Sequence, residues 1–578
     1  MKATPAEPGS RPDGSFGLVR QSTPVDSIAE DHTRALIDLS PLLATELGVP
    51  GRDHLSDDLS PDGHAALADL NRATLARLDG AAPLDATDEV TLAAMRDRLG
   101  LQLESFEAGD HLRDLNNIAS PVQNLRDVFD LMPTRTAEQW ANIAGRMAAL
   151  SGSTDGYIET LRAGIAARTT PALRQVELAI AETADLADEG TSFFTGLATG
   201  AMVEDSAPDA ALAGDLAHGA AEARAAYGRL AAFLRDELAP AARPGDAAGR
   251  DLYERMSRRF VGATLDLDET YAWGVEELAR ITAEQEALAR EIAGPGASVA
   301  DAVRVLDEDP ARTLHGTDAL RAWMQTTADE AVAALDGVHF DIPDELRTIE
   351  AMIAPTQSGG IYYTGPTDDF SRPGRMWWSV PPGVTTFNTW REKTTVYHEG
   401  VPGHHLQIGQ AVHNAAELNW WRRQVCWLSG HGEGWALYSE RLMEEFGFLE
   451  DAGDRFGMLD AQRLRATRVV LDLGVHLGKP AFDRYGGGTW DHDKAWQLLV
   501  DNVNMEEGFL RFELHRYLGW PGQAPSYKVG QRIWEQIRAD AASASRARGE
   551  EFSLKEFHSR ALDLGSLPLD VLRAALLG

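Results

Sequence analysis

The sequence predicts a mainly α-helical protein with a small β-sheet. From about Ile28 onward, Ala, Leu, Glu and Arg dominate, and apolar residues recur three and four positions apart, which places them on one face of a helix. Pro or Gly separates each such segment from the next. After about Gly337 the pattern changes to short segments rich in β-branched and aromatic residues. With 578 residues, 44% of them hydrophobic, the chain can bury a large core.

Four segments carry the helical period clearly: residues 88–107, 137–150, 207–238 and 266–292. The third is rich in Ala, but its Leu and Tyr positions keep the helical period, so helix packing explains it better than low complexity does. No repeat of fixed period is found. We therefore expect one helical domain over residues 23–578, preceded by a flexible tail of residues 1–22 that is rich in Pro, Gly and Ser.

The short segments that predict the sheet are residues 338–343, 348–353, 360–364 and 375–380. An edge strand of this sheet is a candidate to hold an extended peptide by main-chain hydrogen bonds. A loop-rich connection with no role in substrate binding is an equal alternative. After the sheet, Thr389 and Glu392 have the spacing of a capping box, so a helix is expected to begin there.

The composition excludes several classes of function. A formal net charge of −35 argues against binding to nucleic acid or to an anionic membrane, because both need a basic surface. The single cysteine, Cys426, excludes an internal disulfide framework and is expected to be buried. Residues 1–21 lack the apolar run of a signal peptide, and no apolar segment has transmembrane length. A cytoplasmic protein is expected, unless the chain is a processed precursor.

The stretch from residue 397 to 407, which reads YHEGVPGHHLQ, predicts a metal site. A His-Glu pair followed by further histidines offers the ligands that zinc peptidases use to bind a metal and activate water. In the common His-Glu-x-x-His motif the second histidine lies four residues after the first, and here Pro402 occupies that position. Proline cannot bind a metal, and it lacks the N–H that an unbroken helix needs. An ordinary loop with two histidines is the alternative interpretation.

The spacing favours His404 over His405 as the partner of His398. In a straight helix His405 would share the face of His398 but lie about 10.5 Å farther along the axis, too far for one ion. If two residues loop out at Pro402 and Gly403, His404 returns to the one-turn position. We therefore expect a kink there and metal binding by His398 and His404.

A third ligand is expected from residues 430–440, which read GHGEGWALYSE. Glu433 lies between two glycines that let the backbone approach a neighbour or an ion closely, and it completes a two-His, one-Glu set. Glu440, two turns along the same helix face, and His431 are expected to orient the ligands from behind. The alternative for Glu433 is a solvated carboxylate at the start of a helix.

The loop between residues 515 and 530 displays three further candidates. Arg516 or Lys528 is a candidate to hold a substrate carboxylate, and Tyr527 to donate a hydrogen bond to the oxyanion that forms when water attacks a carbonyl. Loops between helices often carry such side chains without a catalytic role, so the ordinary interpretation stays open.

Three motifs, HEGVPGHH, EGWALYSE and PGQAPSYK, occur in an order that resembles the bacterial proteins grouped as domain of unknown function 885. The resemblance spans roughly residues 31–572. That family is similar in fold to the Taq-type thermostable carboxypeptidases, which are mostly helical zincins with a long substrate cleft. In the motif of the family the histidine after Pro-Gly is the fixed one, which corresponds to His404, and His405 has no counterpart. The resemblance implies a metallopeptidase-like catalytic domain.

The expected function is a metallopeptidase with one divalent metal ion, most often zinc in such sites, bound by His398, His404 and Glu433. Glu399 is the expected general base, which takes a proton from water and passes it to the leaving nitrogen. The expected substrate is a short peptide cleaved near its C-terminus. Two alternatives remain, a metal-dependent amidase acting on a small metabolite and a binding protein on an inactive zincin scaffold. The sequence does not determine the oligomeric state.

Overall fold

The prediction of a mainly helical chain is confirmed. The structure, a computed structural model, describes residues 20–354 and 360–578, so the tail expected over residues 1–22 lies outside the described residues except for its last three. The helices in the first half are α1 (Pro24–Leu39), α2 (Pro41–Glu46), α3 (Pro61–Asp79), α4 (Ala86–Glu107), α5 (Pro121–Asp127), α6 (Ala137–Ala167), α7 (Leu173–Ala187), α8 (Phe193–Thr199), α9 (Ala210–Phe233), α10 (Ala239–Ala241), α11 (Arg250–Val261) and α12 (Leu267–Ala293). The later helices are α13 (Val299–Asp307), α14 (Thr317–Leu335), α15 (Thr389–Glu399), α16 (His404–His413), α17 (Ser429–Glu445), α18 (Ala452–His476), α19 (His492–Asn502), α20 (Glu507–Gly519), α21 (Ser526–Arg548), α22 (Leu554–Asp563) and α23 (Leu569–Leu577).

All four helices predicted from periodicity are present, as α4, α6, α9 and α12. Each begins at a polar N-cap whose side chain accepts a hydrogen bond from a free backbone N–H of the first turn. These caps are Asp85, Thr136, Asp209 and Asp266. The N-cap thus fixes where each helix starts, while the apolar face fixes how it packs.

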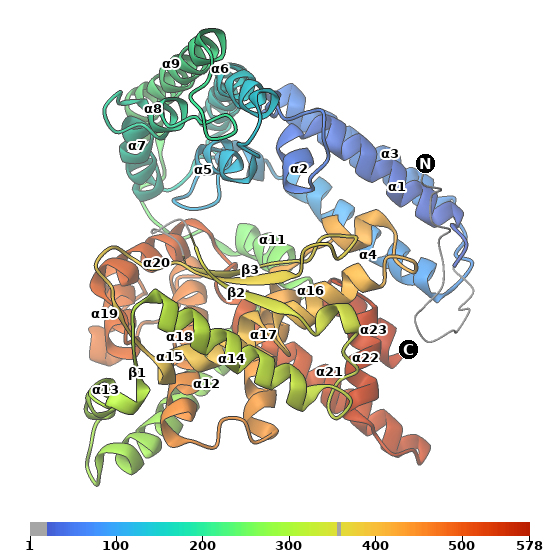
Figure 1. The fold of residues 1–578 in the computed structure, drawn as a ribbon, viewed down its shortest axis with the longest axis vertical. Helices are drawn as coiled ribbons and strands as arrows, with labels where there is room; N and C mark the ends of the chain where they lie inside the picture. Colours follow the sequence, from blue (N-terminus) through green and yellow to red (C-terminus); the bar gives the residue numbers. More distant parts are fainter. Residues whose placement is uncertain (1–19, 355–359) are drawn as a thin grey trace.

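Most buried apolar residues form two large clusters. One lies among helices α5 to α9 and includes Trp140, Tyr157 and Tyr227. The other unites α11, α12 and the C-terminal helices α15 to α23 with α1, α3 and α4, which contribute residues such as Val25 and Met95. In Figure 1 helices α5 to α9 form a separate upper group, whereas α1, α3 and α4 extend from it toward the C-terminal helices. Helices α1, α3 and α4 therefore share a core with helices from the far end of the chain.

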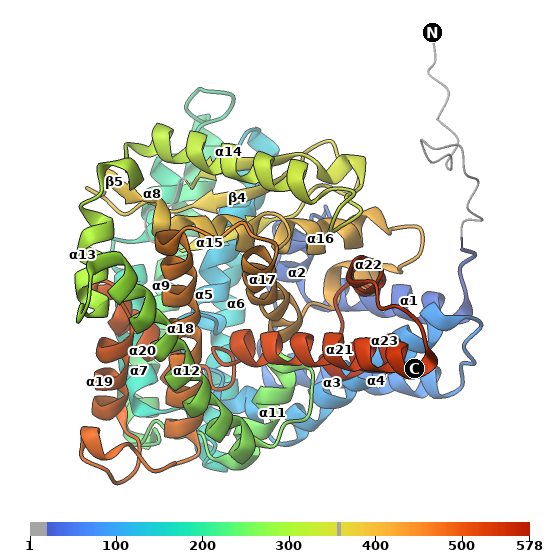
Figure 2. The same ribbon diagram turned by 90° about the horizontal axis from the view of Figure 1, so that it is seen from below.

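A small sheet lies next to α15 and α16, as expected. Its strands are β2 (Ile349–Ile353), β3 (Ile361–Thr364) and β4 (Gly374–Trp378), in the order β2-β4-β3, with β2 parallel and β3 antiparallel to β4. Helix α14 packs on β2 and α16 on β4, so the sheet lies between helices (Figure 2). A second pair, β1 (Thr313–His315) with β5 (Thr386–Asn388), was not predicted, because three residues are too few to show an alternating pattern.

Two local predictions are wrong. Residues 338–343 form a turn rather than a strand, because the chain reverses directly after α14 and the ring of Phe340 packs against His558 and Trp435. The capping box of α15 is absent, since Asn388 is its N-cap and makes no side-chain cap hydrogen bond. Glu392 instead accepts a hydrogen bond of 2.8 Å from the indole Nε1 of Trp378, which ties α15 to β4.

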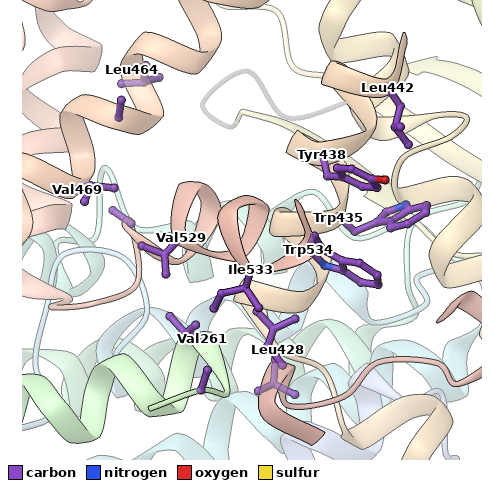
Figure 3. Packing of buried hydrophobic residues seen from close by; sticks show 14 of the residues in the cluster. Val261, Leu428, Trp435, Tyr438, Leu442, Leu464, Val469, Val529, Ile533 and Trp534 are labelled. Atoms are coloured by element: carbon purple, nitrogen blue, oxygen red, sulfur yellow. The ribbon is translucent and has the colours of Figure 1, made fainter. Parts of the chain in front are cut away.

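Helices α17 and α21 cross at very close range in the core. Figure 3 shows Trp435 and Tyr438 of α17 beside Trp534 of α21, and the rings of Trp435 and Trp534 have centroids 5.0 Å apart. The approach depends on glycines, because a Cβ atom added at Gly434 would lie 2.5 Å from the carbonyl carbon of Gly530. The glycines around Glu433 thus serve a close backbone approach, as the sequence predicted.

Gly530→Ala is expected to lower the free energy of unfolding by about 1–3 kcal/mol, the usual cost of overpacking a core. The added methyl would overlap the carbonyl oxygen of Gly430, which belongs to backbone and cannot rotate away. Denaturant unfolding would measure the change. Gly214→Ala is the matched control, because that glycine lies within α9 with open space around it and should gain about 0.5–1 kcal/mol. An equal change in the free energy of unfolding in the two variants would contradict the close contact between α17 and α21 at Gly530.

Candidate metal centre

Three helix ends bring the predicted ligands together. His398 is the penultimate residue of α15, His404 is the first residue of α16, and Glu433 lies in the first turns of α17. One ligand atom from each of the three lies within 4.8 Å of the others. The histidines are buried, with 5% and 7% of their surface exposed, and the carboxylate is largely buried.

The distances between the three ligand atoms fit one shared metal ion better than direct ion pairs between the histidines and Glu433. The Nε2 atoms of His398 and His404 lie 3.3 and 3.5 Å from Oε2 of Glu433. A charge-assisted N–H···O hydrogen bond is shorter, about 2.7–2.9 Å. Ligand atoms about 2.0–2.1 Å from a tetrahedral zinc ion lie about 3.3–3.4 Å from one another. The donor set and its spacing therefore suit a divalent metal such as zinc.

The chain between the two histidines breaks more fully than predicted. Instead of a kink in one helix, α15 ends at Glu399, four non-helical residues follow, and α16 starts at His404. A Cβ atom at Gly403 would overlap the carbonyl oxygen of His398, so the reversal needs glycine there. The carbonyl oxygen of Pro402 accepts a hydrogen bond of 2.8 Å from Nε1 of Trp435, which fixes the break against α17.

His405 lies away from the cluster. Its Nε2 is 2.9 Å from the carbonyl oxygen of Leu346, its Nδ1 is 2.9 Å from the hydroxyl of Tyr363, and its side chain is fully buried. Both ring nitrogens of His405 therefore have hydrogen-bond partners outside the cluster, so neither is available to a metal ion there.

Glu440 lies behind His398, where the sequence placed it. Its Oε1 is 2.8 Å from Nδ1 of His398, while its Oε2 accepts hydrogen bonds from Thr394 at 2.9 Å and from Gln462 at 3.4 Å. A carboxylate on Nδ1 fixes the ring and directs Nε2 toward the cluster. The Nδ1 of His404, by contrast, is buried without a hydrogen-bond partner among the described residues.

The cluster concentrates negative charge in a buried place. Burial alone would lower the pKa of His398, but hydrogen bonds with Glu433 and Glu440 raise it to about 10. Burial opposes ionisation of those two carboxyls, yet their contacts with the histidines hold the pKa of each below its usual range. Several carboxylates around two imidazoles form an environment that attracts a cation.

His431 does not contact the ligands. Its Nδ1 is 2.8 Å from the amide nitrogen of Gln407, and its ring packs edge-on against Trp534 with centroids 5.2 Å apart. Burial lowers its pKa to about 3, so the ring is neutral. The expectation that His431 orients a ligand directly is therefore wrong, because α17 directs this residue into the α21 packing.

Glu399 and Tyr527 lie beside the cluster. Glu399 is 6% exposed, and burial raises the pKa of its carboxyl although His404 and His398 oppose that change. Tyr527, in the first turn of α21, has its pKa raised by burial and by the charge of Glu433, so its hydroxyl keeps its proton. The guanidinium of Arg468 lies over the Tyr527 ring, 5.0 Å from its centroid, and holds the ring in place.

Arg516 and Lys528 are already engaged. Arg516 donates to Glu513 at 3.0 Å and to Gln523 at 2.6 Å. The ammonium of Lys528, in a side chain that is 2% exposed, lies 2.9 Å from a carboxylate oxygen of Glu277 and donates to the amide oxygens of Gln462 and Gln531. Because its three N–H groups all have partners, the predicted role of Lys528 in binding a substrate carboxylate is wrong, and Arg516 is also paired within the protein.

The sequence analysis missed Arg465, on α18. Its charge acts on Glu399, Glu440 and Tyr527, and it is half-buried. Its Nη1 donates only to the carbonyl oxygen of Ala461, one turn back, and its Nε is buried without a partner. Within the described residues no carboxylate lies within ion-pair distance of it. Helix α18 carries four arginines that look alike in the sequence, so only their contacts in the structure single out Arg465.

The fold and the site define a mainly helical protein with a candidate two-His, one-Glu metal centre. The chain belongs to the family described as bacterial protein of unknown function (DUF885), whose model matches residues 41–576. A search of curated proteins found no match.

Two solved structures share the fold. The crystal structure of a protein called a putative lipoprotein, from Colwellia psychrerythraea, is 22% identical with a TM-score of 0.81, covering 96% of this chain and 98% of that one. The structure of a putative lipoprotein of unknown function from Shewanella oneidensis is 16% identical with a TM-score of 0.74, covering 96% of this chain and 100% of that one. At these identities the likeness shows the fold alone. None of the helices in the described part of this chain is long and apolar enough to cross a membrane.

Proposed function

We propose that this protein is a metal-dependent peptidase, with one divalent ion, zinc, held by His398, His404 and Glu433. The observation that carries the proposal is the spacing of the three ligand atoms, with Glu399 next to them and outside the ligand set. A likeness of fold to the Taq-type carboxypeptidases and a cytoplasmic location stay predictions from the sequence.

The chemistry follows from the residues around the cluster. When bound, the ion polarises a carbonyl group and lowers the pKa of a water molecule. Glu399 accepts the proton of the attacking water and delivers it to the leaving nitrogen. Tyr527, protonated because burial raises its pKa, donates a hydrogen bond to the oxygen on which negative charge develops.

The surroundings favour a peptide with a free C-terminus as the substrate. Of the two edges of the sheet, that of β2 is occupied by Gln325, whose amide bonds to Ile349 and Ala351. The other edge strand, β3, carries Tyr363, whose pKa is raised by burial and by the charge of Glu399, and this strand can pair with an extended peptide. Arg465, a cation near Glu399 without a carboxylate partner, replaces Arg516 and Lys528 as the group that binds the terminal carboxylate.

Arg465→Met is expected to lower kcat/KM about 10- to 100-fold on peptides with a free C-terminal carboxylate, the usual loss for a charged hydrogen bond. The same peptides with an amidated C-terminus should be poor substrates of both proteins and unaffected by the change. Arg455→Met is the matched control, because that arginine lies on the same helix and pairs with Glu444 at 3.2 Å. An equal loss on free and amidated peptides would contradict the role of Arg465.

Two measurements separate the proposal from its alternatives. Metal analysis of protein purified without added ions decides between an enzyme and a binding protein on a scaffold that no longer holds metal. Comparison of a peptide library with acylated amino acids decides between a peptidase and an amidase. Turnover of acylated amino acids without turnover of peptides would show that the protein is an amidase and not a peptidase.

A further inference from the structure

A second pocket lies where the two large core clusters meet. It has a volume of about 590 Å³, and its lining comes from α3, α4, α5, α7, α11 and the end of α20, among other segments. None of the three metal ligands lines it. Pockets of this size hold small organic molecules or short peptides, and they often lie between structural units.

Several arginines gather in this pocket, although the protein as a whole is strongly acidic, and the charge of Asp246 acts on one of them, Arg243. Arg243 donates only to the backbone oxygens of Gly245 and Asp246, and Arg259 makes no side-chain hydrogen bond or ion pair within the described residues. Arg113 donates to Asp110, but its Nε is buried without a partner. Burial, with the charge of Arg113, lowers the pKa of Arg243, so the two guanidinium groups repel each other.

The nearest carboxylates do not neutralise these arginines. Asp110 is shared between Arg113, at 2.7 Å, and Arg255, which binds it through two hydrogen bonds of 2.7 and 2.8 Å. Asp114 also lines the pocket, and its carboxylate has no hydrogen bond or ion pair with a described residue. Burial raises the pKa of the Asp114 carboxyl, and the charge of Arg259 opposes that change. The pocket therefore presents guanidinium groups with unused N–H donors and one carboxyl group without a hydrogen-bond partner among the described residues.

Neutral polar groups in the wall also lack partners. Gln175, which is 1% exposed, donates through Nε2 to the carbonyl oxygen of His515, while its Oε1 is buried without a partner. His111 stacks on Phe106, with ring centroids 4.8 Å apart, and its Nδ1 is buried without a partner. A buried polar group left unpaired costs about 1–3 kcal/mol, which a ligand with matching groups would offset.

Apolar side chains form part of the wall, among them Leu101, Leu252, Met256 and Leu518. We propose that this pocket binds a small dipolar molecule of dipeptide or tripeptide size, with its carboxylate on Arg113 and Arg243, its ammonium group on Asp114 and its apolar side chains on this wall. The site is additional to the metal centre and does not depend on the function proposed for that centre.

The loop after α20 lines the pocket and is bonded to the start of α17. Trp520 and Pro521 line the pocket, whereas Gln523, two residues on, bonds to Arg516 and lies 3.5 Å from Ser429 at the start of α17. The loop is fixed to the core, because the backbone N–H of Gly522 donates to Asp472 at 3.0 Å. Ligand binding in the pocket can therefore be tested without the metal.

The test is calorimetric titration of the full-length protein with the dipeptide Ala-Leu, in a chelator that removes metal and prevents hydrolysis. We expect saturable binding that weakens about tenfold or more in Arg243→Met, because a charge-assisted hydrogen bond is lost. The C-terminally amidated dipeptide should bind weakly to both proteins. Arg174→Met is the matched control, since that arginine bonds to Asp246 on the same loop and does not line the pocket.

Two outcomes would overturn the proposal. One is the absence of saturable binding to the unaltered protein. The other is binding that is retained in Arg243→Met and lost in Arg465→Met, which would place the dipeptide at the metal centre. Failure of the peptidase proposal would change neither result, because hydrolysis is not measured.

Discussion

Glu399→Gln is expected to keep its metal and to lose at least about 10²-fold in kcat, the usual effect of removing a general base. The amide has the shape of the carboxylate but cannot accept the proton of water at neutral pH. The residue lies at the end of α15 beside both histidines and is not one of the three clustered ligands, so the metal should stay. Metal content and turnover are measured on the same preparation.

Glu433→Ala is the matched comparison for Glu399→Gln. It removes a ligand rather than a base, so metal content and activity should fall together. Near-normal turnover in Glu399→Gln would refute its role as the base, and full metal occupancy in Glu433→Ala would move the third ligand elsewhere.

His404→Ala is expected to abolish metal binding, whereas His405→Ala should retain it. The Nε2 of His404 is 3.5 Å from Oε2 of Glu433, while both ring nitrogens of His405 are occupied by Leu346 and Tyr363. Two nitrogens that share one zinc ion lie within roughly 4.2 Å of each other, a condition that only a residue facing the cluster can meet.

His405→Ala should still reduce stability, by about 1–3 kcal/mol, because it leaves buried polar partners unpaired. Metal content measured by mass spectrometry, together with denaturant unfolding, separates the two effects. Loss of metal in His405→Ala at unchanged stability would show that the break between α15 and α16 is not as described.

The sequence predicted the helices correctly, and it indicated three residues that the structure brings together, because both inferences follow from simple rules. Periodicity and polar N-caps located α4, α6, α9 and α12, and the chemistry of imidazole and carboxylate indicated His398, His404 and Glu433. It did not predict the pair β1 with β5, since short strands acquire their pairing from the rest of the fold.

The extent of the break between α15 and α16 could not be predicted from the spacing of residues in the sequence. Pro402 and Gly403 indicated that the helix could not continue, and the position of His404 followed from the metal geometry. How far the chain unwinds depends on Trp435, whose indole holds the Pro402 carbonyl from another helix. The steric limits that Pro402 and Gly403 impose depend only on neighbouring residues in the sequence. The hydrogen bond from Trp435 depends on how α17 packs in the fold.

The sequence by itself determined the helical class, the net charge of −35 and the residue types able to bind a metal. Only the tertiary structure decided which cations are left without a carboxylate partner. Lys528 is paired with Glu277, which lies far away in the sequence, whereas Arg465 bonds only to its own helix. The physical reason is that a charge becomes available or is neutralised through contacts of a few ångströms, and folding alone chooses which distant residues make them.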